Sequence, residues 1–109
     1  MTTTYEKLQA KLKGSYTELN NGSRYKDLLP RLYCRKNLGL SIQASKTHYC
    51  SPRDDEGPYT HVEVGFPSRV IEKLRPYAED PKRMTKSVYG WVPLGLLAEI
   101  IDEYGGLKS

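Results

Sequence analysis

Apolar residues near the C-terminus recur at the spacing of an amphipathic helix. Pro93 precedes them at a position suited to a first helical residue, because its missing N–H costs nothing there. Gly105 and Gly106 follow as a typical helix end. The pattern predicts a helix from Pro93 to about residue 104, the most regular element of the chain. Its stripe consists of Leu94, Leu97, Ile101 and Tyr104, widened by Leu96 and Ile100.

A shorter helix is predicted near the N-terminus. Thr3 and Glu6 have the spacing of a capping box, and apolar residues follow at positions 5, 8 and 12 before Gly14. Residues 14–24 are rich in Gly, Asn and Ser and are expected to form a loop. Residues 24–29 are expected to form a helical turn that Pro30 ends.

The middle of the chain alternates between apolar and polar residues, as half-buried strands do. The alternation predicts strands over residues 40–45 and 61–66, and shorter apolar runs predict strands over residues 32–35 and 88–92. The inward positions of the two alternating segments are Leu40, Ile42 and Ala44, then Val62, Val64 and Phe66.

A third helix is expected after Pro67, with Ser68 as its N-cap and Pro76 as its end. Its buried side chains would be Val70, Ile71 and Leu74. Residues 82–87 are polar and loop-like. Together these elements predict an α+β fold: a small, mostly antiparallel sheet of three to four strands, covered on one face by two or three helices. The 109 residues are expected to form a single domain, 1–109.

Composition places the chain among globular domains, because 38% of its residues are apolar and 28% are charged. Its apolar runs are too short to cross a bilayer, and the first six residues lack the pattern of a signal peptide. The expected location is therefore cytoplasmic. Cys34 and Cys50 are accordingly expected to be reduced thiols rather than a disulfide.

The charge is unevenly distributed. Residues 1–53 carry ten Lys and Arg against three acids, a net of +7, whereas residues 54–109 carry seven against ten, a net of −3. A basic half attracts phosphate backbones or acidic protein surfaces through the same long-range field.

Residues 47–61 contain both histidines, one cysteine and the run Asp54-Asp55-Glu56. Cys34, His48, Cys50 and His61 are zinc-ligand types but lack the spacing of a zinc module. Continued strand alternation would place His48 and Cys50 toward the core and His61 on the opposite side. A thiol nucleophile at Cys50 would also need oxyanion donors, which a turn does not offer. The three acids lack the order of a calcium loop. We therefore expect no metal, no cofactor and no enzymatic activity.

Nine tyrosines stand out beside one Phe and one Trp. Some must serve the core, and the expected core-edge residues are Tyr5, Tyr77 and Tyr104. The expected exposed ones are Tyr25, Tyr33, Tyr49 and Tyr59. Tyrosines among Lys and Arg suit both protein interfaces and stacking surfaces for nucleic acid, so both alternatives stay open.

Two segments resemble known sequences. One runs from Tyr49-Cys50-Ser51-Pro52-Arg53 through Asp54 to Tyr59 and on to residues 62–68, and the other runs from Val88-Tyr89-Gly90-Trp91 to Gly106. Both resemble short uncharacterised proteins encoded by bacteriophages and prophages. The resemblance covers roughly residues 39–106 and leaves the basic N-terminal third unmatched. It implies a small accessory protein made in the bacterial cytoplasm. Many such proteins bind a host machine stoichiometrically, including anti-CRISPR and other counter-defence inhibitors.

The leading hypothesis is a non-enzymatic binding protein that occupies a host protein or nucleoprotein complex, such as a CRISPR effector, as a host-defence inhibitor. The alternative is a nucleic-acid-binding accessory protein that uses the basic half, and the third is a metal-dependent or thiol enzyme. The residues expected to contact the partner are Tyr33, Arg35, Lys36, Tyr49, Arg53, Asp54, Asp55, Glu56 and Tyr59.

Overall fold

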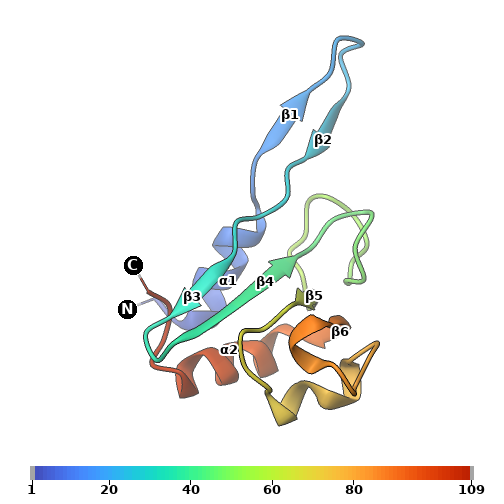
Figure 1. The fold of residues 1–109 in the computed structure, drawn as a ribbon. Helices are drawn as coiled ribbons and strands as arrows, with labels where there is room; N and C mark the ends of the chain where they lie inside the picture. The colour runs from blue at the N-terminus through green and yellow to red at the C-terminus, as the bar shows by residue number, and fades with distance from the viewer. Residues whose placement is uncertain (1, 109) are drawn as a thin grey trace.

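The computed structural model describes residues 2–108 and has an α+β fold, which confirms the predicted class (Figure 1). Two antiparallel sheets are present, one of two strands in the order β1-β2 and one of four in the order β3-β4-β5-β6. The helices are α1 (Thr4–Leu12) and α2 (Leu94–Glu103), with 3₁₀ helices η1 (Glu72–Tyr77) and η2 (Met84–Lys86). The strands are β1 (Tyr16–Glu18), β2 (Arg24–Lys26), β3 (Leu32–Cys34), β4 (Leu38–Gln43), β5 (His61–Gly65) and β6 (Val88–Pro93).

The core lies between the four-stranded sheet and the two α-helices, which pack against one another (Figure 1). α1 contributes Leu8 and Leu12. The predicted stripe of α2 is buried at Leu94, Leu97, Ile100 and Ile101 and partly buried at Leu96 and Tyr104. The inward residues of β4 and β5 are buried as the alternation predicts. No helix within residues 2–108 is long and apolar enough to cross a membrane.

Both helix starts follow local chemistry. At α1 the predicted capping box is present: the Glu6 N–H donates to the Thr3 hydroxyl at 3.1 Å, and the Thr3 N–H donates to the Glu6 carboxylate at 3.3 Å. α2 begins one residue later than predicted, because Pro93 ends β6 and serves as the N-cap. Gly105 and Gly106 then end the helix with positive φ angles.

Residues 14–27 form a projecting hairpin, so the predicted loop and the predicted helical turn are wrong (Figure 1). Thr17 pairs with Tyr25 at the centre of this β1–β2 arm. The tip is a three-residue connection, Asn20-Asn21-Gly22, in which Gly22 has a φ of +85°. A glycine there supplies the left-handed residue that such a hairpin requires.

The third predicted α-helix is also wrong: it is replaced by the 3₁₀ helix η1, which contains Pro76. Ser68 does not cap a helix, because its N–H donates to the Gly39 carbonyl at 2.8 Å and its hydroxyl accepts from the Gly39 N–H at 2.9 Å. These bonds hold the segment against the β3–β4 turn. Ile71 is buried as predicted, whereas Val70 is exposed.

A β-bulge interrupts the pairing of β5 with β6. Val62 pairs with Val92 and Val64 with Tyr89, so that Gly90 and Trp91 both lie opposite one residue of β5. The extra residue keeps Tyr89 and Val92 buried and turns Trp91 outward with a φ of +49°.

Phe66 departs from the predicted alternation. β5 ends at Gly65, and Phe66 takes a φ of +49° and is exposed. The predicted inward position of Phe66 is therefore wrong.

Candidate functional site

Residues 44–60 form a long connection between β4 and β5 that is hydrogen-bonded along its length. The Asp54 carboxylate accepts from the N–H groups of Glu56 and Gly57 at 3.0 and 2.9 Å. These bonds lower the pKa of Asp54. The Asp55 carboxylate accepts from the Lys46 N–H at 2.9 Å. Both acids therefore shape the loop as well as charge its surface.

The base of the arm holds the inner side of this loop. Lys26 of β2 donates from Nζ to the carbonyls of Leu12 and Ala44, at 2.5 and 2.8 Å, and to the Tyr59 hydroxyl at 3.1 Å. Burial lowers the pKa of Lys26, while nearby Asp55 opposes that shift. The lysine thus joins α1, the arm and the loop at one point.

Tyr59 is 1% exposed, so its predicted place on a contact surface is wrong. Its hydroxyl donates to the Asp54 carbonyl at 2.8 Å, and its backbone is bound on both sides by the Gln9 side chain of α1. Burial raises the pKa of the Tyr59 hydroxyl. Tyr59 therefore connects the acidic turn of the loop to α1 through buried contacts.

Tyr49 and Trp91 form an exposed stacked pair on the outer side of the sheet. Their ring centroids are 5.0 Å apart with an interplanar angle of 27°, and they are 37% and 47% exposed. The Arg53 guanidinium lies over the Tyr49 ring, 5.6 Å from its centroid. We call Tyr49, Arg53 and Trp91 the aromatic cluster.

Backbone contacts fix the aromatic cluster in place. The Trp91 N–H donates to the Tyr49 carbonyl at 3.0 Å, and the Tyr49 N–H donates to the Glu63 carboxylate at 2.9 Å. Gly90 lies directly beneath, where an added Cβ would be 3.3 Å from the Tyr49 Cβ. The bulge therefore turns the Trp91 ring outward, and the glycine leaves room for Tyr49 to stack against it.

The remaining predicted contact residues lie at the other end of β4. Arg35 and Lys36 bind the α2 terminus, where their N–H groups donate to the carbonyls of Gly106 and Tyr104 at 3.0 and 2.9 Å. Since six strand residues span about 20 Å, these residues and the loop do not form one continuous site. The sequence interpretation also omits Trp91, although its position in a strand beside Gly90 is a signal of a bulge.

Tyr33 lies at that far end as well, on a shallow groove of 250 Å³ beside the β3–β4 turn. Within the described residues its lining includes Arg31 and Lys108 and no acidic side chain. Arg31 is oriented by bonds from Nη2 to the Gly39 and Phe66 carbonyls, at 2.9 and 2.7 Å. The groove is thus a second, positively charged surface.

The four residues considered as zinc ligands make separate local contacts. The Cys50 thiol donates to the Ser45 carbonyl, while His48 and His61 bond to the hydroxyls of Ser45 and Thr60 through Nδ1. Cys34 lies in β3, and both cysteines are free thiols. Among residues 2–108, His, Cys, Asp and Glu side chains nowhere gather in threes as a metal ion would require.

Cys50 also lacks the environment of an activated nucleophile. Burial raises the pKa of its thiol, which disfavours the thiolate that nucleophilic attack needs.

Comparison of the chain with protein-family models, with curated proteins and with solved structures finds no match. The aromatic cluster and the charged groove are therefore the features from which a function is inferred.

Proposed function

We propose that this chain acts by binding another protein through the aromatic cluster. The observation that supports the proposal is the stacked, half-exposed pair of Tyr49 and Trp91 beside Arg53. Trp, Tyr and Arg are the residue types that dominate binding energy at protein interfaces. A single exposed ring is common on protein surfaces, whereas two stacked rings with a guanidinium form a compact anchor.

Rigidity strengthens the proposal. The ring-bearing segments are joined by backbone hydrogen bonds to one another and to Glu63. A surface that is ordered before binding loses less conformational entropy on association. The matching partner surface would present an apolar pocket for Trp91 next to a carboxylate for Arg53.

The resemblance to phage-encoded accessory proteins suggests that the partner is a bacterial host protein, and counter-defence inhibition is the role we propose for such a complex. Asp54 and Asp55 are bound within the loop, so we assign them to its shape and leave Arg53 as the charge that meets the partner.

The proposal is tested by affinity capture from bacterial lysate with three immobilised proteins: the wild type, Trp91→Ala and Tyr33→Ala. Tyr33 is 55% exposed and lies at the far end of β4, so it is the matched control for removal of an exposed ring. A host protein held in equal stoichiometry by the wild type and Tyr33→Ala, and lost with Trp91→Ala, supports the proposal. Equal capture by all three proteins contradicts it.

The second candidate function is nucleic-acid binding at the groove of Arg31, Tyr33 and Lys108. The observation that favours it is the local excess of positive charge beside an exposed ring. In this case affinity for a nucleic acid would fall by about 0.9 log units per phosphate contact for each tenfold rise in salt on duplex DNA. Gel shifts across a salt series, with Tyr33→Ala and Arg31→Gln beside the wild type, distinguish this function from protein binding.

A further inference from the structure

The β1–β2 arm has one face against the loop and one face open to solvent. Tyr16 and Lys26 point to the loop, where the Tyr16 hydroxyl donates to the Asp55 carbonyl at 2.7 Å. Side chains two residues apart share a face, so Ser15, Thr17 and Leu19 lie together on the opposite, open side. Leu19 is 47% exposed at the arm tip.

The outer edge of β1 carries backbone groups that do not pair with β2. Bonds from the Leu19 N–H to Ser23 and from the Asp27 N–H to Ser15 mark the hydrogen-bonded pairs of the arm. Because such pairs alternate along an antiparallel ladder, the N–H and C=O groups of Tyr16 and Glu18 point away from β2. An edge of this kind is a template for another strand.

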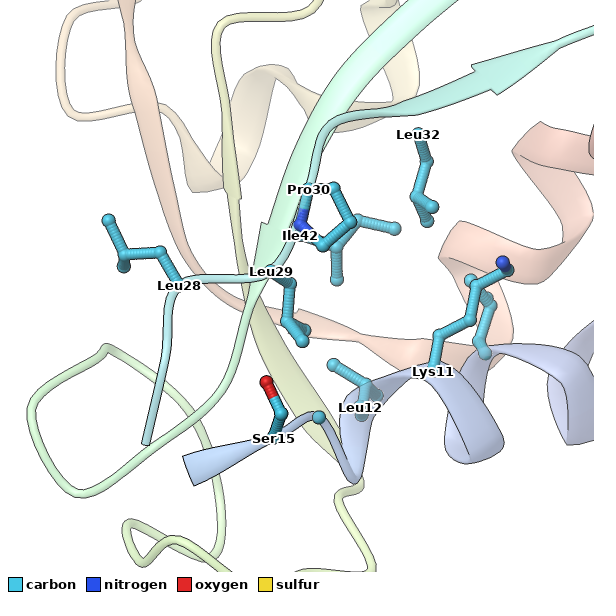
Figure 2. A pocket seen from close by; sticks show the side chains of 10 residues that line it. Lys11, Leu12, Ser15, Leu28, Leu29, Pro30, Leu32 and Ile42 are labelled. Atoms are coloured by element: carbon cyan, nitrogen blue, oxygen red, sulfur yellow. The ribbon is translucent and has the colours of Figure 1, made fainter. Parts of the chain in front are cut away.

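An apolar cleft of 190 Å³ opens at the base of the arm (Figure 2). Leu12, Leu29 and Ile42 are directed toward it, and Leu28 lines it from the segment that follows β2. Ser15 borders the cleft and lies four residues from Leu19. One arm therefore has an unpacked apolar side chain at its tip and an apolar cleft at its base.

We propose that a second copy of this chain pairs with the first along the outer edge of β1. In a two-fold antiparallel arrangement, Tyr16 would exchange backbone hydrogen bonds with Glu18 of the second copy. Thr17 would then face its own counterpart on the two-fold axis, and Leu19 would lie opposite Ser15 of the other chain. Each tip leucine reaches the cleft of the other copy, so each cleft is completed by a residue of the second chain.

Charge selects β1 over β2 as the paired edge. The equivalent pairing along β2 would set Lys26 directly opposite Arg24 of the second copy, since these are the outward residues of that strand. Like charges in directly opposed positions are destabilising. Along β1 the opposed residues are Tyr16 and Glu18, which carry no like charges.

Cysteine trapping tests both the dimer and its register. On the axis the two Thr17 Cα atoms would be about 4.5 Å apart, within the separation that a disulfide spans. Thr17→Cys under mild oxidation should therefore shift to twice the 12.4 kDa chain mass on a non-reducing gel. The control is Tyr25→Cys, which lies on the same face but on the other strand. The native Cys34 and Cys50 are buried, so the wild type should stay at the monomer mass.

Sedimentation velocity gives an independent readout. The wild type should move from monomer toward dimer as its concentration rises, and Leu19→Asp should remain a monomer with an unchanged circular-dichroism spectrum. Crosslinking of Thr17→Cys alone, together with this loss in Leu19→Asp, supports the proposal. Crosslinking of Tyr25→Cys, equal crosslinking of both variants, or a monomeric wild type with an uncrosslinked Thr17→Cys overturns it.

Discussion

Lys26 shows how one polar side chain can organise a small fold. Its ammonium group replaces water with three protein acceptors, the carbonyls of Leu12 and Ala44 and the hydroxyl of Tyr59. These acceptors belong to α1 and to the two ends of the loop. The Lys26 ammonium therefore connects segments of the fold, which an exposed lysine on the surface does not.

We predict that Lys26→Met destabilises the protein by about 2–4 kcal/mol, because its three acceptors lose a charged donor and at least one stays buried without a partner. Urea unfolding monitored by circular dichroism measures the change. Lys7→Met is the control: Lys7 is exposed on α1, and its replacement should alter the free energy of unfolding by less than about 0.5 kcal/mol. Equal stability of the two variants would refute the structural role of Lys26.

The Asp54 turn makes the loop sensitive to acid. Hydrogen bonds from Gly57 and Glu56 lower the pKa of Asp54 below its ordinary value of 3.8. These hydrogen bonds therefore stabilise the folded loop at pH values above 3.8. The stabilisation is lost as the pH falls through the lower pKa that Asp54 has in the folded protein. The Gly57 amide resonance in NMR spectra should shift with a midpoint below 3.8, and Asp54→Asn should abolish that transition. A midpoint at or above 3.8 would contradict the geometry.

Residue type alone does not distinguish Tyr49 from Tyr59. Both flank the same acidic turn, yet Tyr59 is buried because Gln9 and Lys26 reach it from elements 50 and 33 positions away in the sequence, respectively. No local pattern carries that information. Of the predicted loop site, Tyr49, Arg53, Asp54 and Glu56 remain exposed and Asp55 is half-buried, whereas Tyr59 becomes internal structure.

Elements with strong local signals are the ones that the sequence predicts. The start and end of α2 follow from Pro93 and the glycine pair, and the strands β4, β5 and β6 follow from their apolar runs. The arm is missed because residues 15–27 have no alternation between apolar and polar positions, which is the usual mark of a strand. Its only clear signal is the Asn20-Asn21-Gly22 turn between two segments that each contain a tyrosine.

Two irregularities limit what alternation can predict. The inward–outward pattern of β4 continues to Ala44 and breaks at Ser45, which is also buried, so Cys50 is buried through the loop fold and not through strand parity. In β6 the bulge reverses the parity between Tyr89 and Val92. Both depend on tertiary contacts with the loop, which lie outside any short sequence window.

Two glycines in different elements should respond in opposite ways to alanine. Gly57 has a φ of +73°, and an added Cβ would lie 2.9 Å from the Tyr59 ring, whereas Gly95 in α2 has open space around it. Gly57→Ala should therefore lower the melting temperature. Gly95→Ala should raise it, because alanine gains up to about 1 kcal/mol over glycine inside a helix. Differential scanning calorimetry of both variants checks the pair, and a stabilised Gly57→Ala would contradict the described loop.

At the scale of the molecule, ion pairing within residues 2–108 is confined to the second half of the chain. In the part of the chain that the structure describes, the ion pairs are Lys73 with Glu99 and Glu103, and Arg75 with Glu72. The ten cations of residues 1–53 are held by carbonyls and rings or lie exposed. The charge asymmetry of the sequence therefore persists at the surface.

The molecule thus has separate surfaces at its two ends. The aromatic cluster lies beside the loop, and the basic groove lies at the β3–β4 turn, one strand length away. The arm extends from the body as a third feature (Figure 1). Because of this separation, a substitution at one surface leaves the side chains of the other surface in place.

The central claim is that the aromatic cluster is the partner-binding surface, and Trp91, the only tryptophan of the chain, reports on it directly. Acrylamide quenching of its fluorescence should be strong in the free protein, since Trp91 is half-exposed. The same measurement is then made on the complex with the captured host protein, with this chain selectively labelled so that tryptophans of the host protein do not contribute to the signal. In the complex the quenching constant should fall severalfold and the emission should shift to shorter wavelength. An unchanged quenching constant in a saturated complex would contradict the claim.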